Sequence, residues 1–338
     1  MKWRGRPAGP VPPDPGLTDL AGDRRLRRLE LAVTRRLDGL LHGQYQGLLP
    51  GPGSEPAGSR EYRPGEDEVR RMDWAVTART TVPHVRQLDA DRELTTWLLV
   101  DASVSMEYGT AELDKRELAV AAVAAVGFLT AGVGNRLGAS VLTPTGLRRH
   151  APGSGRTHLF GLLRMLLAAP RHGGYDQDTA PLAPPDLATA LDGLRRVATR
   201  RGLVVVISDF LDGLPESPGQ PAPWEQLLRR LAVRHQVLAV EVTDPREWEL
   251  PDVGLVTLVD PESGRRREVW TGDPGLRQRY AAAAAAQRDQ VRQALRRGGA
   301  AHLPLRTDRD WVADIVRHVH QQRRLATVGV PAGRGGGG

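Results

Sequence analysis

The chain contains no cysteine among its 338 residues. A disulfide framework, an iron–sulfur cluster, a thiolate zinc site and a cysteine nucleophile are therefore excluded. Lysine is almost missing as well: Lys2 and Lys115 are the only two, so 45 of the 47 basic residues are arginine. Any catalytic motif that needs a lysine at another position is thereby excluded.

Long apolar runs are also missing. The longest uncharged stretch, 118–135, is shorter than the roughly 20 residues that a membrane-spanning helix needs. We interpret it as a buried helix. The first residues, MKWRGRPAGPVPPDPG, lack the apolar run that follows the basic residues of a signal peptide. We therefore expect a soluble, cytoplasmic protein with no transmembrane segment.

The charge is positive but well mixed. Lysine and arginine number 47 against 40 acidic residues, a net charge of +7, and the two signs alternate over most of the length. A nucleic-acid interface requires clustered basic residues, so this pattern favours a coding preference for arginine over nucleic-acid binding. With 40% hydrophobic and 26% charged residues, the composition is typical of a folded globular protein.

Composition divides the chain into five segments. We expect a disordered Pro/Gly-rich tail, an amphipathic helix, a β-rich segment, a large α/β domain and a disordered Gly-rich tail, at 1–18, 19–43, 44–93, 94–325 and 326–338. The arginines of the helix at 20–42 form either a solvated face or a contact with nucleic acid or an acidic membrane.

The large domain alternates apolar strands with helices. Strands are predicted at TTWLLVD, LGASVLT, LVVVISD, HQVLAVEV and AHLPLRT, with a hairpin formed by GLVTLVD and RRREVW. Helices are predicted at 112–131, 158–168, 186–199, 223–234, 275–297 and 308–324. Wholly apolar strands that alternate with helices predict an α/β fold with a mostly parallel sheet and helices on both faces.

Two of these strands end in a carboxylate. LLVDASVSM (98–106) places Asp101 at a strand end, with Ser103 and Ser105 at alternate positions, and LVVVISD ends in Asp209. Side chains two apart in an extended loop point the same way, so these four residues can converge at the carboxyl edge of the sheet. Carboxylate and hydroxyl oxygens suit Mg²⁺ or Mn²⁺. The alternative is that each residue merely caps the next helix.

The segment DASVS matches the D-x-S-x-S core of the metal-ion-dependent adhesion site of von Willebrand factor type A domains. Four further segments resemble one branch of that group, the domain-of-unknown-function-58 family: REYRPGEDEVRRMDWAVTART, VVVISDFLDGL, DPREWELPDVGL and LRTDRDW. The resemblance extends from about Gly39 to Arg324.

This resemblance implies a von Willebrand factor A-like fold with a β-rich addition. It also implies that the protein is a non-enzymatic adaptor, associated with a MoxR-type AAA+ ATPase. Carried over residue by residue, the metal site comprises Asp101, Ser103, Ser105 and Asp209, and an acidic residue of a protein ligand would complete it.

One ligand of the family pattern is replaced. The second loop of the adhesion site supplies a threonine ahead of a helix, but here LAPPDLATAL places Pro185 at that position. Thr157 and Thr179 are within plausible reach, although no motif supports either. We therefore expect weak or partner-dependent binding of the metal ion.

Residues 60–93 allow two interpretations. Their charged residues can pair within a small sheet, with Tyr62 and Trp74 packed beneath, or they can form a contact surface for a partner. The second interpretation makes the protein a scaffold that needs no metal.

One enzyme class remains as an alternative. A strand that ends in Asp101, a later one that ends in Asp209, and Thr143 between them are loosely similar to haloacid-dehalogenase-type phosphatases. Ser103 stands where that family has its general acid, and Lys115 lies too early in the chain to be its lysine. PGSGRTHL (152–159) lacks the lysine of a phosphate loop, and His318 and His320 are poorly spaced for a metal. We expect no catalytic residue and no small-molecule substrate.

Overall fold

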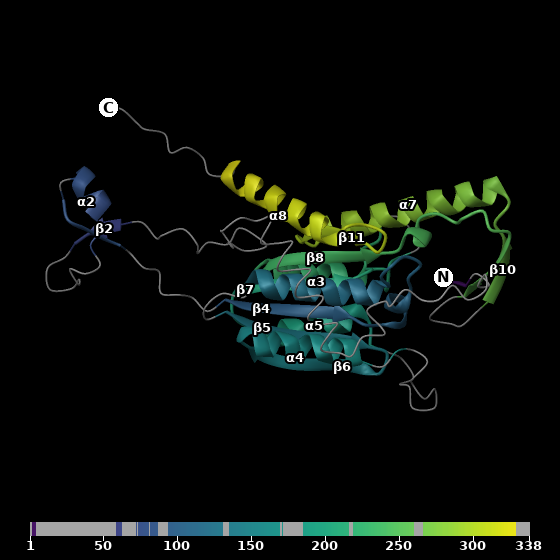
Figure 1. Ribbon diagram of the computed structural model, residues 1–338, viewed down its shortest axis with the longest axis horizontal. Helices are drawn as coiled ribbons and strands as arrows, with labels where there is room; N and C mark the ends of the chain where they lie inside the picture. Colours follow the sequence, from purple (N-terminus) through teal and green to yellow (C-terminus); the bar gives the residue numbers. More distant parts are fainter. Residues whose placement is uncertain are drawn as a thin grey trace.

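A mixed six-stranded sheet forms the centre of the computed structural model (Figure 1). Its strand order is β11-β8-β7-β4-β5-β6, and all neighbours pair in parallel except β5 and β6. The strands are β4 (Thr95–Asp101), β5 (Arg136–Thr143), β6 (Gly146–Gly153), β7 (Gly202–Ser208), β8 (Gln236–Thr243) and β11 (Ala301–Arg306). The structure describes residues 2–4, 59–62, 72, 74–80, 82–86, 94–130, 135–169, 171, 185–215, 219–259 and 266–328.

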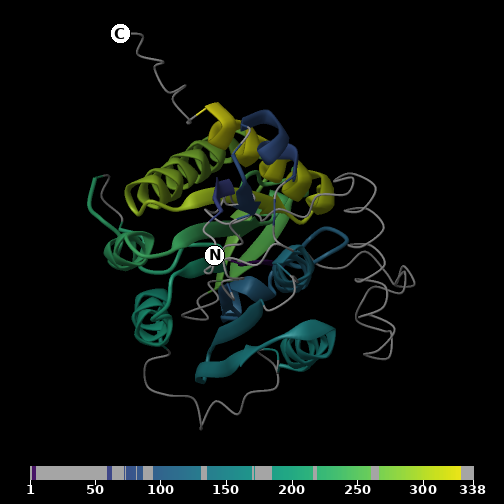
Figure 2. The same ribbon diagram turned by 90° about the vertical axis from the view of Figure 1, so that its left-hand side faces the viewer.

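Helices cover both faces of this sheet, as Figure 2 shows in an end-on view. One face packs against α3 (Lys115–Thr130), α4 (Gly155–Ala168) and α8 (Trp311–Val328). The other face packs against α5 (Leu187–Val197), α6 (Pro223–Ala232) and α7 (Pro274–Arg297). The predicted α/β class, a mostly parallel sheet between two helical layers, is therefore confirmed.

The apolar strand sequences follow from this burial on both sides. Leu98 and Val100 of β4 belong to the core under α3, whereas Trp97 and Leu99 belong to the core under α5. Successive side chains of a strand point to opposite faces, so a strand covered on both faces needs apolar residues at every position. The strand order, with one antiparallel edge strand, agrees with the von Willebrand factor A-like fold that the resemblance implies.

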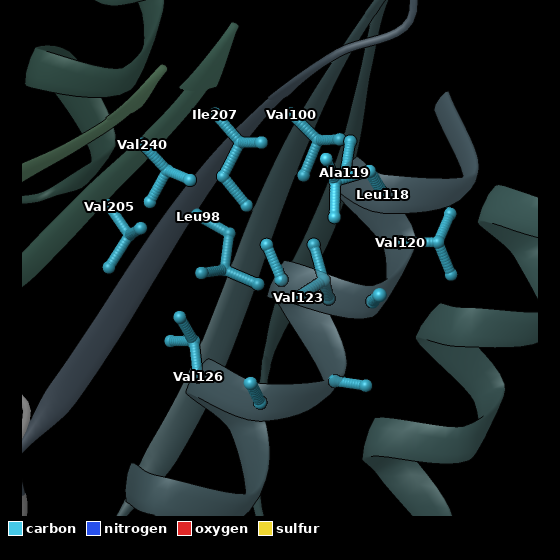
Figure 3. Close-up of a cluster of buried hydrophobic side chains, with 14 of the residues drawn as sticks. Leu98, Val100, Leu118, Ala119, Val120, Val123, Val126, Val205, Ile207 and Val240 are labelled. Carbon is cyan, nitrogen blue, oxygen red and sulfur yellow. The ribbon is translucent and has the colours of Figure 1, made fainter. Parts of the chain in front are cut away.

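Helix α3 lies in the middle of one core. Leu118, Val123 and Val126 pack against Leu98 and other apolar residues of β4, β7 and β8 (Figure 3). Five of its sixteen residues are alanines, whose small side chains let the helix lie close to the sheet. The uncharged stretch near 118–135 is thus a buried core helix over most of its length. Among the described helices, none has the length and apolar character to cross a bilayer.

The hairpin predicted after the fourth strand is present. β9 (Leu255–Val259) pairs in antiparallel fashion with β10 (Arg266–Trp270). A third strand, β1 (Lys2–Arg4), pairs with the other edge of β9. The prediction of a wholly disordered tail at 1–18 is wrong for these three residues, because an open strand edge offers backbone groups to any extended segment.

Strand β6 is missing from the sequence-based prediction. Its sequence, GLRRHAPG, is polar and contains Pro152, because it is an edge strand with one partner. The C-terminal helix also runs further than expected, to Val328. The predicted amphipathic helix at 19–43 and the end of the Gly-rich tail lie outside the described residues.

The segment from 44 to 93 is described only in part. β2 (Ser59–Glu61) and β3 (His84–Arg86) form the short antiparallel pair that its composition predicts. It also contains a helix that we did not predict, α2 (Trp74–Thr80). Trp74 is 66% exposed, so the expected packing of this ring beneath a small sheet is wrong.

The start of β7 provides a test of the sheet register. Gly202 pairs with Thr95, and a Cβ at Gly202 would lie 2.1 Å from the Thr95 carbonyl oxygen. We expect Gly202→Ala to lower the free energy of unfolding by about 1–3 kcal/mol, because the backbone must move.

Gly161 on α4 is the control, since a Cβ there meets nothing within 4 Å. Gly161→Ala should raise stability by about 0.5–1 kcal/mol in the same urea titration. Equal effects of the two changes would contradict the register.

Candidate functional site

The direction of chain progression reverses between β4 and β7. From β4 the chain moves to β5 and β6, and it then returns to the other side of β4 for β7, β8 and β11. In open α/β sheets a crevice forms at such a point, beyond the carboxyl ends of the strands. Asp101 is the last residue of β4, and Asp209 directly follows β7. The two predicted carboxylates therefore lie at the switch point.

Short polar contacts hold the first carboxylate. The Ser208 hydroxyl donates to Oδ2 of Asp101 at 2.7 Å, and the backbone N–H of Ser103 donates to Oδ1 at 2.9 Å. The Ser103 and Ser105 hydroxyl oxygens are 3.1 Å apart, and Ser105 also hydrogen-bonds with Asp209. The structure thus brings together all four residues that were predicted as a metal site.

A lysine that was not predicted pairs with one member of this cluster. Lys115, the first residue of α3, is 0% exposed, and its Nζ lies 2.8 Å from Oδ2 of Asp209. The same nitrogen lies 2.7 Å from Oε1 of Glu247. From the sequence we considered Lys115 only as the lysine of a phosphatase; its pairing with Asp209 and Glu247 gives it a different place, at the start of α3. Its rarity among 45 arginines was the one available signal.

Opposite pKa shifts follow from this arrangement. Burial and the nearby Asp209 carboxylate raise the pKa of Asp101 to about 6, against hydrogen bonds from Ser208 and Ser103 that lower it. Burial also disfavours charge on Asp209 and Lys115, but their mutual attraction outweighs it. The pKa of Asp209 is therefore lowered and that of Lys115 is raised, with Glu247 contributing to the second shift. Lys115 and Asp209 stay charged at neutral pH, and Asp101 is the group that titrates.

A second carboxylate anchors the neighbouring loops. Asp244, which follows β8 and is 0% exposed, accepts the backbone N–H and the hydroxyl of Thr110 at 2.8 and 2.7 Å. It also accepts the Thr307 hydroxyl at 2.8 Å and the backbone N–H of Arg246 at 2.9 Å. The loops after β4, β8 and β11 are therefore joined through one buried side chain.

Glu247 connects this anchor to the lysine. Its Oε2 accepts the backbone N–H of Asp244 at 2.9 Å, completing a capping box around the 3-10 turn Pro245–Glu247. Its Oε1 pairs with Lys115, and Arg288 of α7 lies 3.5 Å from Oε2. Asp244 and Glu247 belong to the segment DPREWELPDVGL. Its D-P-x-E pattern indicates the local turn, but no sequence signal shows which cation Glu247 meets.

The other candidates are dispersed. Thr157 begins α4 after β6 has returned to the amino edge of the sheet, opposite Asp101, so it is not a ligand. Pro185 precedes α5, and Thr179 lies outside the described residues. The Thr143 hydroxyl donates to the Gly146 carbonyl at 2.8 Å within a turn. Asp212 accepts the Leu187 N–H at 2.6 Å and holds the start of α5.

The donor set does not fit a resident divalent ion, although its oxygens are of the right kind. Both oxygens of Asp101 accept hydrogen bonds, and the two serine hydroxyls pair with each other. Asp209 already pairs with a full positive charge. No side-chain oxygen of these four residues is buried without a partner, as an ion site without its ion would require. Binding of Mg²⁺ or Mn²⁺ therefore stays a prediction, and this arrangement does not favour it.

The family described as "Protein of unknown function DUF58" matches residues 58–290, more than half of the chain. The chain belongs to the DUF58 family. Two uncharacterized proteins, from Mycobacterium bovis and Mycobacterium tuberculosis, are each 54% identical over 308 residues and share 90% coverage in both directions with this chain. The expected family membership is confirmed, and the association with a MoxR-type ATPase stays a prediction.

Solved structures with a similar fold are distant from this DUF58 protein. BatB from Bacteroides thetaiotaomicron aligns over 68% of this chain and 99% of its own, at 13% identity and a TM-score of 0.37. A von Willebrand factor type A protein from Catenulispora acidiphila aligns over 71% and 43%, at 11% identity and a TM-score of 0.32. Identities and TM-scores this low do not support a fold assignment. The assignment therefore depends on the strand order and the D-x-S-x-S loop of the chain itself.

The raised pKa of Asp101 predicts a specific pH dependence. Its folded-state pKa of about 6 lies above the ordinary 3.8, so this group favours the folded state below pH 3.8 and loses that contribution as the pH rises through 6. Asp101→Asn cannot lose a proton. Its free energy of unfolding, measured relative to the unmodified protein by urea titration, should therefore rise by about 2 kcal/mol between pH 4 and pH 7.

The control for this measurement is Asp192→Asn, because Asp192 lies on the exposed side of α5, where Arg195 and Arg196 lower its pKa. Its difference from the unmodified protein should not rise over the same range. A flat difference for Asp101→Asn would contradict the close approach of the two buried carboxylates.

Proposed function

We propose that this DUF58 protein is a non-enzymatic interaction module and that it serves as a partner of a MoxR-type AAA+ ATPase. Its family and its von Willebrand factor A-like fold are generally non-catalytic, which supports an adaptor role. The predicted cytoplasmic location belongs to the same proposal.

The observation that carries the proposal is the burial of the polar cluster. Asp101 and Asp209 are each 2% exposed, and Lys115 is 0% exposed. A phosphatase reaction would need a carboxylate in contact with the substrate, and the groups that could attack or bind a phosphate ester are here enclosed and paired. Two residues after Asp101 the chain has Ser103 rather than an acid, so the general acid is missing too. The cluster stabilises the loops, and the loops provide the surface.

The docking region that we propose is the carboxyl-edge surface, defined as the loops at 103–105, 109–112, 211–215 and 308–310. Residues 109–112 and 308–310 are exposed. Through Thr110 and Thr307, Asp244 joins the loop at 109–112 to the residue just before the loop at 308–310. A surface held in one shape loses little conformational entropy when a partner binds, and this favours affinity.

An acidic protein ligand was expected because an ion would leave one coordination position open. If no ion is bound, the partner must instead recognise the loops themselves. Binding of Mg²⁺ or Mn²⁺ at the site stays a prediction.

A second docking region is favoured by one observation. Trp74 on α2 is 66% exposed and Val82 is 42% exposed, and exposed tryptophans are frequent centres of protein interfaces. This agrees with the interpretation of residues 60–93 as a contact surface that needs no metal.

A matched pair of substitutions distinguishes the two regions. Ala111 is exposed in the loop after β4, and Ala286 is exposed on α7. We expect Ala111→Arg to weaken retention of a purified MoxR-type ATPase in a pull-down by at least about tenfold, because the long charged side chain enters the docked surface. Ala286→Arg makes the same chemical change elsewhere and should leave retention unchanged.

Trp74→Ala tests the second region in the same assay. Loss of retention with Trp74→Ala, together with normal retention by Ala111→Arg, would move the docking site to residues 60–93. Failure of the unmodified protein to retain any such ATPase would contradict the proposed partnership itself.

A further inference from the structure

The position of Lys115 has a consequence that the adhesion-site motif does not suggest. Its ammonium pairs with Asp209, one of the four residues that the motif predicts as ligands of a divalent ion. It contacts Asp209 at 2.8 Å and Glu247 at 2.7 Å. One lysine thus bridges carboxylates that follow two neighbouring strands of the sheet, β7 and β8.

We propose that Lys115 is the built-in cation of this site, so that the D-x-S-x-S loop is organised by an internal ammonium group and requires no metal ion. The proposal extends the docking role proposed above to the way in which its site is held together.

The choice of lysine supports this assignment. The chain uses arginine at 45 of its 47 basic positions, yet a lysine occupies the buried one beside Asp209. An ammonium is a compact point charge with three donors, whereas a guanidinium is a wide planar group that needs a matching flat partner. The Lys115 ammonium accordingly reaches two carboxylates from different loops in a fully buried space, as a small metal ion would do.

The neighbouring residue shows the contrast. Arg116, at 5% exposure, is also buried, but its guanidinium donates to the carbonyl oxygens of Leu166 and Ala169, at 3.3 and 2.6 Å, and lies 3.5 Å from Glu107. Arg116 therefore joins α3 to the end of α4 and takes no part in the carboxylate cluster. Two consecutive buried cations have separate roles.

Charge balance explains why an ion and Lys115 exclude each other. An ion bound by Asp101 and Asp209 would lie beside the buried ammonium, and like charges at close range repel strongly where water is excluded. Without the ammonium, Asp209 and Glu247 would lose the positive charge that compensates both of them. A hard divalent cation could then compensate this pair of carboxylates. Lys115 thus determines which kind of cation the site holds.

The first test uses the unmodified full-length protein and Mn²⁺ as the probe. We expect the melting temperature to agree within about 1 °C in EDTA, in 5 mM Mg²⁺ and in 5 mM Mn²⁺, because a ligand that does not bind the folded state cannot stabilise it. Electron paramagnetic resonance should detect no stoichiometric Mn²⁺ binding that Asp101→Asn removes. Binding of that kind would overturn the proposal.

The second test removes the ammonium. Lys115→Ala should lower the melting temperature in EDTA by about 10 °C, because two buried carboxylates lose their partner. Addition of 5 mM Mn²⁺ should recover a large part of this loss, since the ion can now occupy the vacated position. The control is Arg116→Ala, which also removes a buried cation but should show no recovery with Mn²⁺. Recovery in both variants, or in neither, would overturn the proposal.

If Lys115→Ala does not fold in EDTA, the same comparison is made during refolding with and without Mn²⁺. Folding that depends on Mn²⁺ supports the proposal, and folding that fails in both conditions contradicts it. None of these measurements involves a partner. Loss of ATPase retention therefore counts against the proposed function alone, whereas a metal-stabilised unmodified protein counts against the built-in cation alone.

Discussion

A charged amine removed from water must be paired with carboxylates, and at Lys115 this requirement joins three distant parts of the chain. The lysine begins α3, Asp209 follows β7, and Glu247 ends the turn after β8. Each partner alone would be costly to bury, because an isolated charge is poorly solvated inside a protein. Together they determine how the loops at the carboxyl edge of the sheet lie relative to one another. The docking surface proposed for this DUF58 protein depends on that arrangement.

The charged groups continue beyond Lys115 across the carboxyl half of the sheet. Arg288 approaches Glu247 at 3.5 Å and Glu241 at 3.3 Å, and Glu241 meets His302 at 2.8 Å. The Arg288 guanidinium also lies 4.7 Å from the centre of the Trp248 ring. Acidic and basic side chains therefore alternate from α3 to β11, and the helices of both faces contribute to one network. This explains physically why the segment containing Glu247 and Trp248 is so rich in charged and aromatic residues.

The same cluster explains why a familiar motif can have an unfamiliar role. D-x-S-x-S supplies oxygen atoms, but those oxygens can be satisfied by an ion, by a lysine or by one another. In this protein the Asp101 oxygens accept hydrogen bonds from Ser208 and Ser103, and Asp209 pairs with Lys115. A motif thus indicates where polar atoms converge, whereas the residues that approach from elsewhere decide what they bind.

The sequence by itself determined the parts of this protein that depend on local pattern. Apolar strands such as LLV before Asp101 and VVVIS before Asp209 predicted the parallel sheet and the meeting of two carboxylates at its edge, because burial on both faces requires a continuous apolar run. Polar β6 and helix α2 were missed, since an edge strand and a short helix need no continuous apolar run in the sequence. Only the tertiary structure decided that Lys115 and Glu247 complete the cluster. Their contact joins residues 132 positions apart, and no local propensity encodes which distant charge a buried charge will meet.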